Sequence, residues 1–105
     1  MPGETLKGHL DLLLLAVLGS RAAHGYAVIE ALRRSSGGLF DLPEGTIYPA
    51  LHRLESQGLL ASRWVDRTPR RRRVYELTAK GRRSLARRES EWRAFSQAVD
   101  ATVGR

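Results

Sequence analysis

The sequence contains no cysteine, which excludes a disulfide framework, a thiolate nucleophile and a cysteine-ligated zinc site. Its three histidines, His9, His24 and His52, fall in separate segments without HExxH-type spacing, so we expect neither a metal site nor a metal cofactor. A glycine-rich phosphate loop and a grouping of histidine with carboxylates are also missing. We therefore expect that the chain is not an enzyme and holds no cofactor.

A long hydrophobic run is missing as well. The longest apolar stretch, Leu12–Leu18, spans seven residues, whereas a membrane-spanning helix needs roughly twenty. A secretory leader is a closer match because Lys7 precedes this stretch, but Asp11 and Arg21 flank it and no small-x-small cleavage site follows. We expect a soluble, cytoplasmic protein with no membrane partner, in the reducing compartment that the absence of cysteine also favours.

Acidic residues are few relative to basic ones: 11 Asp and Glu stand against 18 Lys and Arg, for a net charge of +7. A sequence pI near 11.0 indicates an anionic partner, either a nucleic acid or an anionic membrane surface. The 105 residues, 42% of them hydrophobic, suffice for one domain with a modest core. A partner subunit would therefore help to stabilise the fold.

Two helical segments are predicted in the first third of the chain. The first, Leu6–Leu18, is apolar on nearly every side, so we expect it to be buried on more than one side, partly against another subunit, and to end at Gly19. The second runs from His24 to the glycine pair at 37–38. His24 is expected to help start this helix, and its buried stripe is expected to contain Tyr26, Ile29 and Leu32.

A third helix is predicted from Thr46 to Gln57. Thr46 is the expected N-cap, and Pro49 then falls in the first turn, where its missing N–H costs nothing. One side carries the apolar positions Ile47, Leu51 and Leu54. The opposite side carries Pro49, His52, Arg53 and Ser56, and Tyr48 lies on the flank of that side.

Beyond Gly58 the pattern changes to period two and then returns to helical spacing. Two strands are predicted, at 59–65 and 73–78, around the turn-like segment DRTPRR. We expect Arg67 and Arg70–Arg73 at the tip of this hairpin and Trp64 in the core. Thr78 caps a last helix, which reaches Val103 and carries the apolar stripe Leu85, Trp92, Phe95, Val99 and Val103.

This order of elements predicts a mainly α fold with a two-stranded β wing. A helix that buries one side and presents the other after a turn meets the requirement of a helix-turn-helix, and the hairpin that follows would be its wing. We assign residues 1–78 to a winged helix-turn-helix DNA-binding domain and residues 79–105 to a C-terminal dimerisation helix, the two forming one compact unit.

Three strings carry a family resemblance: HGYAVIEAL, GTIYPALHRLESQGLL and RRVYELTAKG. Over roughly Leu10 to Phe95 the chain resembles the PadR-like transcriptional regulators, a winged-helix group named for a phenolic-acid-responsive repressor. The resemblance implies a cytoplasmic, DNA-binding repressor that often responds to a small molecule. The short length and single C-terminal helix are similar to a smaller subfamily whose members are homodimers through that helix.

By motif position, the resemblance implies that Thr46, Tyr48 and Pro49 open the recognition helix. The outward side of that helix adds His52 and Arg53, and the arginine run adds phosphate or minor-groove contacts. Several of these assignments have a structural alternative: Tyr48 as an aromatic at the core edge, His52 as a solvated histidine, Arg53 as an ion-pair partner within the fold, and the arginine run as a charged strand edge. The candidate DNA-binding residues are thus Thr46, Tyr48, Pro49, His52, Arg53, Arg70, Arg71, Arg72 and Arg73.

Trp92 and Phe95 are the candidate contacts for an effector. The resemblance implies that tryptophans at this place flank a cavity for flat, apolar compounds in some members, whereas aromatic residues at helical spacing more often only pack. The partners expected are double-stranded DNA, a second copy of the chain and a small apolar or aromatic effector. The leading hypothesis is a repressor that binds an inverted-repeat operator; the alternative is a winged-helix module for protein interaction or RNA binding.

Overall fold

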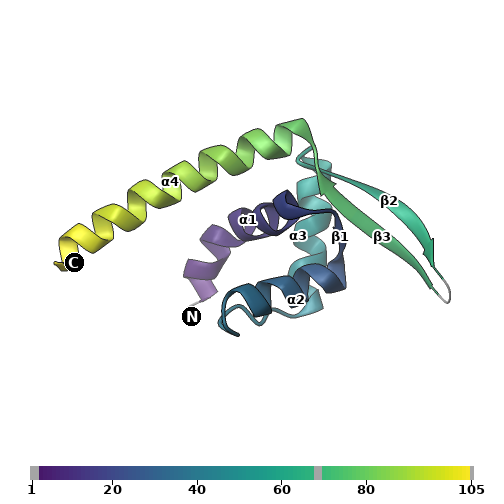
Figure 1. The fold of residues 1–105 in the computed structure, drawn as a ribbon, viewed down its shortest axis with the longest axis horizontal. Helices are drawn as coiled ribbons and strands as arrows, with labels where there is room; N and C mark the ends of the chain where they lie inside the picture. Colours follow the sequence, from purple (N-terminus) through teal and green to yellow (C-terminus); the bar gives the residue numbers. More distant parts are fainter. Residues whose placement is uncertain (1–2, 68–69, 105) are drawn as a thin grey trace.

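The computed structural model describes the chain at residues 3–67 and 70–104, with side chains at 9–66 and 70–104. Figure 1 shows helices gathered beside a small sheet, with the long C-terminal helix extending away from them. The elements, in chain order, are α1 (Gly3–Ser20), β1 (Ala23–His24), α2 (Gly25–Ser35), α3 (Glu44–Ser56), β2 (Leu60–Arg67), β3 (Arg70–Leu77) and α4 (Ala79–Val103).

The core lies where α1, α2 and α3 meet the base of the β2–β3 hairpin. Ile47, Leu51 and Leu54 of α3 are fully buried there, which confirms the predicted apolar side of this helix. Tyr75 of β3 is the largest of the fully buried side chains, and burial raises the pKa of its phenol. The other members of the core are Leu14, Leu15, Leu18, Val28, Ile29, Leu32, Ala50, Leu59, Leu60 and Leu77.

The sheet has three antiparallel strands in the order β1-β3-β2. The hairpin register runs from Leu60 opposite Leu77 to Arg67 opposite Arg70. β1 pairs its two residues with Tyr75 and Val74 of β3. The predicted fold class, mainly α with a β wing, is confirmed, but the sheet gains a third strand, because two residues are too few to show a period in the sequence.

Gly19 does not end α1, which continues to Ser20, so that prediction was wrong. A Cβ atom at Gly19 would lie 3.0 Å from Cδ2 of Leu85 on α4. The glycine thus serves close packing of two helices rather than helix termination. Leu13 and Val17 are half-buried against the core, while Ala16 is exposed.

His24 starts α2 as expected, with its Nδ1 accepting a hydrogen bond from the backbone N–H of Ala27. The buried side of α2, however, contains Gly25, Val28, Ile29 and Leu32. Tyr26 is 56% exposed, so its predicted place in the stripe was wrong. The stripe begins one residue earlier because the aromatic ring of Tyr48, on α3, occupies the space beside Gly25.

α3 begins before the predicted cap. Pro43 is the N-cap residue and its carbonyl accepts from the N–H of Ile47 at 3.1 Å, so Thr46 lies inside the helix. Pro49 consequently lies beyond the first turn, where it cannot donate to the carbonyl of Gly45. Gly45 is exposed, so that carbonyl remains open to solvent.

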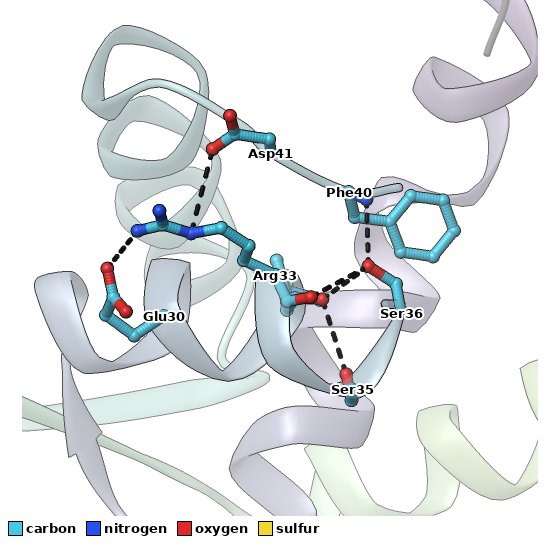
Figure 2. A network of polar contacts seen from close by, with 7 residues as sticks. Glu30, Arg33, Ser35, Ser36, Phe40 and Asp41 are labelled. Carbon is cyan, nitrogen blue, oxygen red and sulfur yellow. Dashed lines mark hydrogen bonds and ion pairs between the residues drawn. The ribbon is translucent and has the colours of Figure 1, made fainter. Parts of the chain in front are cut away.

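The turn between α2 and α3 is fixed by side chains (Figure 2). Ser36 donates its hydroxyl proton to the carbonyl of Leu32 at 2.7 Å and accepts the N–H of Phe40 at 2.8 Å. Arg33 reaches across the turn to Asp41 at 3.9 Å. Because these contacts close the C-terminal end of α2 onto the next segment, the angle between α2 and α3 is set locally.

α4 is capped by Thr78, as predicted: the Thr78 hydroxyl accepts from the N–H of Gly81 at 3.0 Å. The helix ends at Gly104, which adopts a left-handed conformation with φ of 89°. Figure 1 shows that its first turns lie against the body while its C-terminal half projects outward, giving the molecule a length of 53 Å. Four large apolar side chains of this helix are exposed: Trp92, Phe95, Val99 and Val103.

We predict that Gly25→Ala destabilises the protein by about 1–3 kcal/mol, because the new Cβ would lie 2.6 Å from Cζ of Tyr48. Gly45→Ala is the matched control: it also falls in the first turn of a helix, and a Cβ there meets nothing within 4 Å. The control should leave the stability unchanged or raise it by up to about 1 kcal/mol. Urea unfolding of the two variants measures both values, and equal effects would contradict the packing of Tyr48 on Gly25.

Candidate nucleic-acid interface

The outward side of α3 is free of contacts with the core. Pro49, His52, Arg53 and Ser56 are all exposed, as predicted, while Thr46 is half-buried. A helix of this kind, sealed on one side by Ile47, Leu51 and Leu54, presents a continuous strip of side chains to a partner. The strip contains no acidic residue among its four exposed members.

Arg53 is held in place by α1. Its guanidinium donates two hydrogen bonds to the carboxylate of Asp11, at 2.6 and 3.0 Å, and these bonds raise the pKa of Arg53 above its usual value. Arg88 of α4 approaches the same carboxylate at 3.8 Å. The ion pair left open by the sequence is therefore present, and the half-exposed guanidinium of Arg53 still lies at the edge of the outward strip.

Tyr48 lies at the junction of α2 and α3. Its ring packs over Gly25 and is half-buried against the core. The core-edge position considered for Tyr48 is thus the one it occupies in the free protein. The DNA contact assigned to Tyr48 stays a prediction, and it would have to be made by the part of the ring left exposed.

Arg67 and Arg70 form the last pair of the hairpin, at its tip as predicted, whereas Arg71–Arg73, the rest of the arginine run, lie further along β3, so their predicted place was wrong. Of the expected turn-like segment 66–71, residues 66–67 and 70–71 belong to the strands, and residues 68–69 lie outside the described residues. Because side chains alternate along a strand, the run divides between the two faces of the hairpin. Register places Arg71 and Arg73 on the face of Asp66 and Trp64, and places Arg70 and Arg72 on the other face.

The inner face of the hairpin, which continues into the core, carries two arginines that bind acidic groups within the protein. Arg71 pairs with Asp66 at 3.0 Å, and Arg73 pairs with Glu55 of α3 at 3.4 Å. Both guanidiniums also stack over the ring of Trp64, at 4.8 and 5.5 Å from its centroid. Trp64 is 54% exposed, so its predicted burial in the core was wrong.

The outer face of the hairpin forms a hollow of about 620 Å³ with the segment that joins α1 to α2. Four arginines line it: Arg21 from the segment after α1, Arg63 from β2, and Arg70 and Arg72 from β3. His24 completes the lining, with its Nε2 2.6 Å from Nη1 of Arg72. We call this group of five side chains the outer basin. Partial burial and the charge of Arg72 lower the pKa of His24 below its usual value.

Trp92 and Phe95 lie together on α4, with ring centroids 6.0 Å apart. His9 of α1 meets the Trp92 ring edge-on at 5.0 Å. These rings border a hollow of about 240 Å³ whose lining also includes Leu12. Both aromatic side chains are about half exposed, as are Val99 and Val103 further along the helix. The predicted stripe of α4 is therefore present and only partly covered beyond Leu85.

A helix buried on one side, a preceding helix joined to it by a short turn, and an arginine-rich hairpin together define a winged helix-turn-helix protein. The model of the PadR-like family of transcriptional regulators matches residues 14–87, and the chain belongs to this family. Members of this family are transcriptional regulators and not enzymes, which confirms the expectation that the chain is no enzyme.

Similar proteins support this assignment. The transcriptional regulator Rv3488 of Mycobacterium tuberculosis is 42% identical over 78% of this chain and 74% of its own length. The crystal structure of a PadR family transcriptional regulator from Eggerthella lenta has a TM-score of 0.83 and 34% identity, covering 96% of this chain and 87% of that one. A PadR family transcription regulator from Clostridium difficile has a TM-score of 0.79 and 31% identity, covering 91% and 99%.

Three residues of the interface region were missed in the sequence: Asp11, Arg21 and Arg63. Period-two counting from Arg72 through the hairpin would have placed Arg63 on the same face, given the register. No sequence signal links Arg21 or Asp11 to their partners, which are distant along the chain. Over the described part of the chain, no helix is long and apolar enough to cross a membrane.

We predict that the stability of the protein falls as the pH drops below about 6.5, and that His24 contributes to this loss. The folded state lowers the pKa of His24, so the unfolded state binds more protons there, and the stabilisation present at higher pH is lost on acidification. His24→Asn retains an N-cap acceptor but cannot titrate. Urea unfolding between pH 7.5 and 5.5 should show a shallower loss in the variant, and parallel curves would contradict the prediction.

Proposed function

We propose that the protein is a dimeric, sequence-specific DNA-binding repressor of the PadR type, acting in the cytoplasm on an inverted-repeat operator. The observation that carries the proposal is the exposed strip of α3 beside an arginine-rich hairpin. α3 is a helix of 13 residues, and a helix with its side chains has the width that the major groove of B-DNA admits.

The exposed strip contains residue types suited to base edges and phosphates. His52 and Arg53 offer hydrogen-bond donors. Thr46, Tyr48 and Pro49 lie toward the N-terminal end of α3, and it is this end of a recognition helix that contacts base edges. On the adjoining wing, Arg70 and Arg72 supply positive charge for phosphates or a narrow minor groove. Arg71 and Arg73 of the same run already have acidic partners within the protein. The net charge of +7 adds a favourable long-range attraction to the duplex.

The partly exposed stripe of α4 supports a homodimer. Trp92, Phe95, Val99 and Val103 are 42%, 57%, 41% and 63% exposed on the part of the helix that projects from the body. Contiguous apolar surface of this kind on a projecting helix marks an interaction site. A second copy of α4 has the same stripe, so a two-fold contact would cover both at once.

A small apolar or aromatic effector would bind beside Trp92 and Phe95. The hollow there has about 240 Å³ in a single chain, whereas ligand sites usually have roughly 300–1,000 Å³. One chain therefore supplies only part of a site, and a second copy of α4 would have to close it. Effector binding in this way would depend on the dimer.

Selection of bound duplexes from a random DNA pool tests the proposed function. We expect an inverted repeat with half-sites about one helical turn apart, because a two-fold dimer places its two α3 helices in successive major grooves. His52→Ala and Arg53→Ala should each weaken binding to the selected duplex more than to random duplex, by roughly tenfold in the ratio of affinities.

Three outcomes would contradict the proposal or a part of it. Equal affinity for selected and random duplex would indicate non-specific binding only. Tighter binding to RNA or to a protein partner than to any duplex would favour the alternative, a winged-helix interaction module. Selection of a single half-site without its repeat would support DNA binding but contradict the dimer.

We predict that Val99→Glu converts the dimer to a monomer, because a charge would have to be buried at the two-fold contact. Gln97→Glu is the control, since Gln97 is exposed and lies on the opposite side of α4. Sedimentation equilibrium should give a dimer dissociation constant raised at least roughly tenfold for Val99→Glu and unchanged for Gln97→Glu. Equal constants for the two variants would place the dimer contact elsewhere.

A further inference from the structure

The outer basin concentrates positive charge with little to neutralise it. Its four guanidiniums face one nearby carboxylate, that of Glu76, which pairs with Arg63 at 3.3 Å. Within the described residues, no carboxylate lies within 4.0 Å of the guanidinium of Arg21, Arg70 or Arg72. Arg71 and Arg73, on the inner face, each have an acidic partner and the Trp64 ring.

His24 adds a second indication that an anion belongs in the basin. A neutral imidazole has one lone pair for hydrogen bonding and one N–H. Nδ1 faces the backbone N–H of Ala27 at 3.3 Å, and Nε2 faces the guanidinium of Arg72 at 2.6 Å. Both neighbours are hydrogen-bond donors, and the single lone pair of a neutral His24 can accept from only one of them. When Nδ1 accepts from Ala27, the Nε2 proton points at the Arg72 donor.

Because Nε2 and Nη1 are only 2.6 Å apart, the two side chains would have to separate to admit an oxygen anion. Placed between them, the anion would accept from Nε2–H of His24 and from Arg72 together, and the Nδ1 cap of α2 would be kept. The start of α2 lies at the same edge, because Ala27 lines the hollow, and the N-terminal end of a helix carries partial positive charge. Arg21 and Arg63 also line the hollow.

We propose that the outer basin is a phosphate-binding site in which the backbone of the bound duplex lies, with Arg21, Arg63, Arg70, Arg72 and His24 as its contacts. The proposal rests on the proposed function, since it takes duplex DNA as the partner. It divides the arginine run by face: Arg70 and Arg72 hold phosphate, whereas Arg71 and Arg73 stabilise the wing. It also adds Arg21, from a segment outside both the recognition helix and the hairpin.

The dependence of duplex affinity on salt separates the two faces. The slope of log K against log salt is negative, and each phosphate that the protein neutralises adds roughly 0.9 to its magnitude. The double variant Arg70→Gln/Arg72→Gln should reduce the magnitude of the slope by up to that amount for each arginine replaced. Arg21→Gln should reduce the magnitude further. The matched double variant Arg71→Gln/Arg73→Gln removes the same charge from the other face and should leave the slope nearly unchanged.

Folding and charge are controlled within the same series. Circular dichroism melts set a temperature at which all variants are folded. Arg70→Lys/Arg72→Lys keeps the charge and should restore most of the slope, because binding a phosphate needs a cation more than a guanidinium. Equal slope reductions for the inner-face and outer-face double variants would overturn the basin and leave sequence-specific binding intact.

Titrations followed by NMR distinguish the source of the phosphate. The imidazole signals of His24 should shift, with a raised pKa, on addition of a duplex lacking the operator, and far less with inorganic phosphate at equal phosphate concentration. A response to inorganic phosphate alone would assign the basin to a free anion and overturn the assignment to the duplex backbone. No response to either would overturn the site itself. If the wild-type protein fails to prefer any selected duplex, the proposed function fails, whereas the duplex titration still decides whether the basin binds phosphate.

Discussion

The burial of one side of α3 is the constraint on which the rest of the molecule depends. Ile47, Leu51 and Leu54 are fully buried, so the rotation of α3 about its own axis is fixed, and the outward strip is fixed with it. The ring of Tyr48 over Gly25 and the closed turn after α2 set the position of its N-terminal end. Only a helix held in this way can present side chains to a partner in one orientation.

Periodicity in the sequence was sufficient for the main elements and for the buried side of α3. It failed where packing overrode local signals. Gly19 has the residue type of a helix end, yet α1 continues to Ser20, and the glycine instead makes room for Leu85. Thr46 has the residue type of a cap, yet Pro43 takes that position one turn earlier. Propensity describes what a residue favours in isolation, and the neighbouring element decides between the alternatives.

The arginine run shows why the site was harder to predict than the fold. Its charge is visible in the sequence, but its division between two faces depends on the hairpin register and on where the strands stop. One face meets Glu55, Asp66 and Trp64 and becomes part of the structure of the wing. The other meets Arg21 and His24, which no local pattern connects with it. Arginines that are adjacent in the sequence thus have different electrostatic surroundings.

Asp11 connects the outward strip to the long helix. Its side chain is only 20% exposed and lies near two guanidiniums, Arg53 of α3 and Arg88 of α4. Leaving a carboxylate of this kind without a partner costs more than an exposed ion pair contributes. Because Arg88 also lies 3.8 Å from the carboxylate of Asp11, the proposed contact of Arg53 with DNA would not leave Asp11 without a partner.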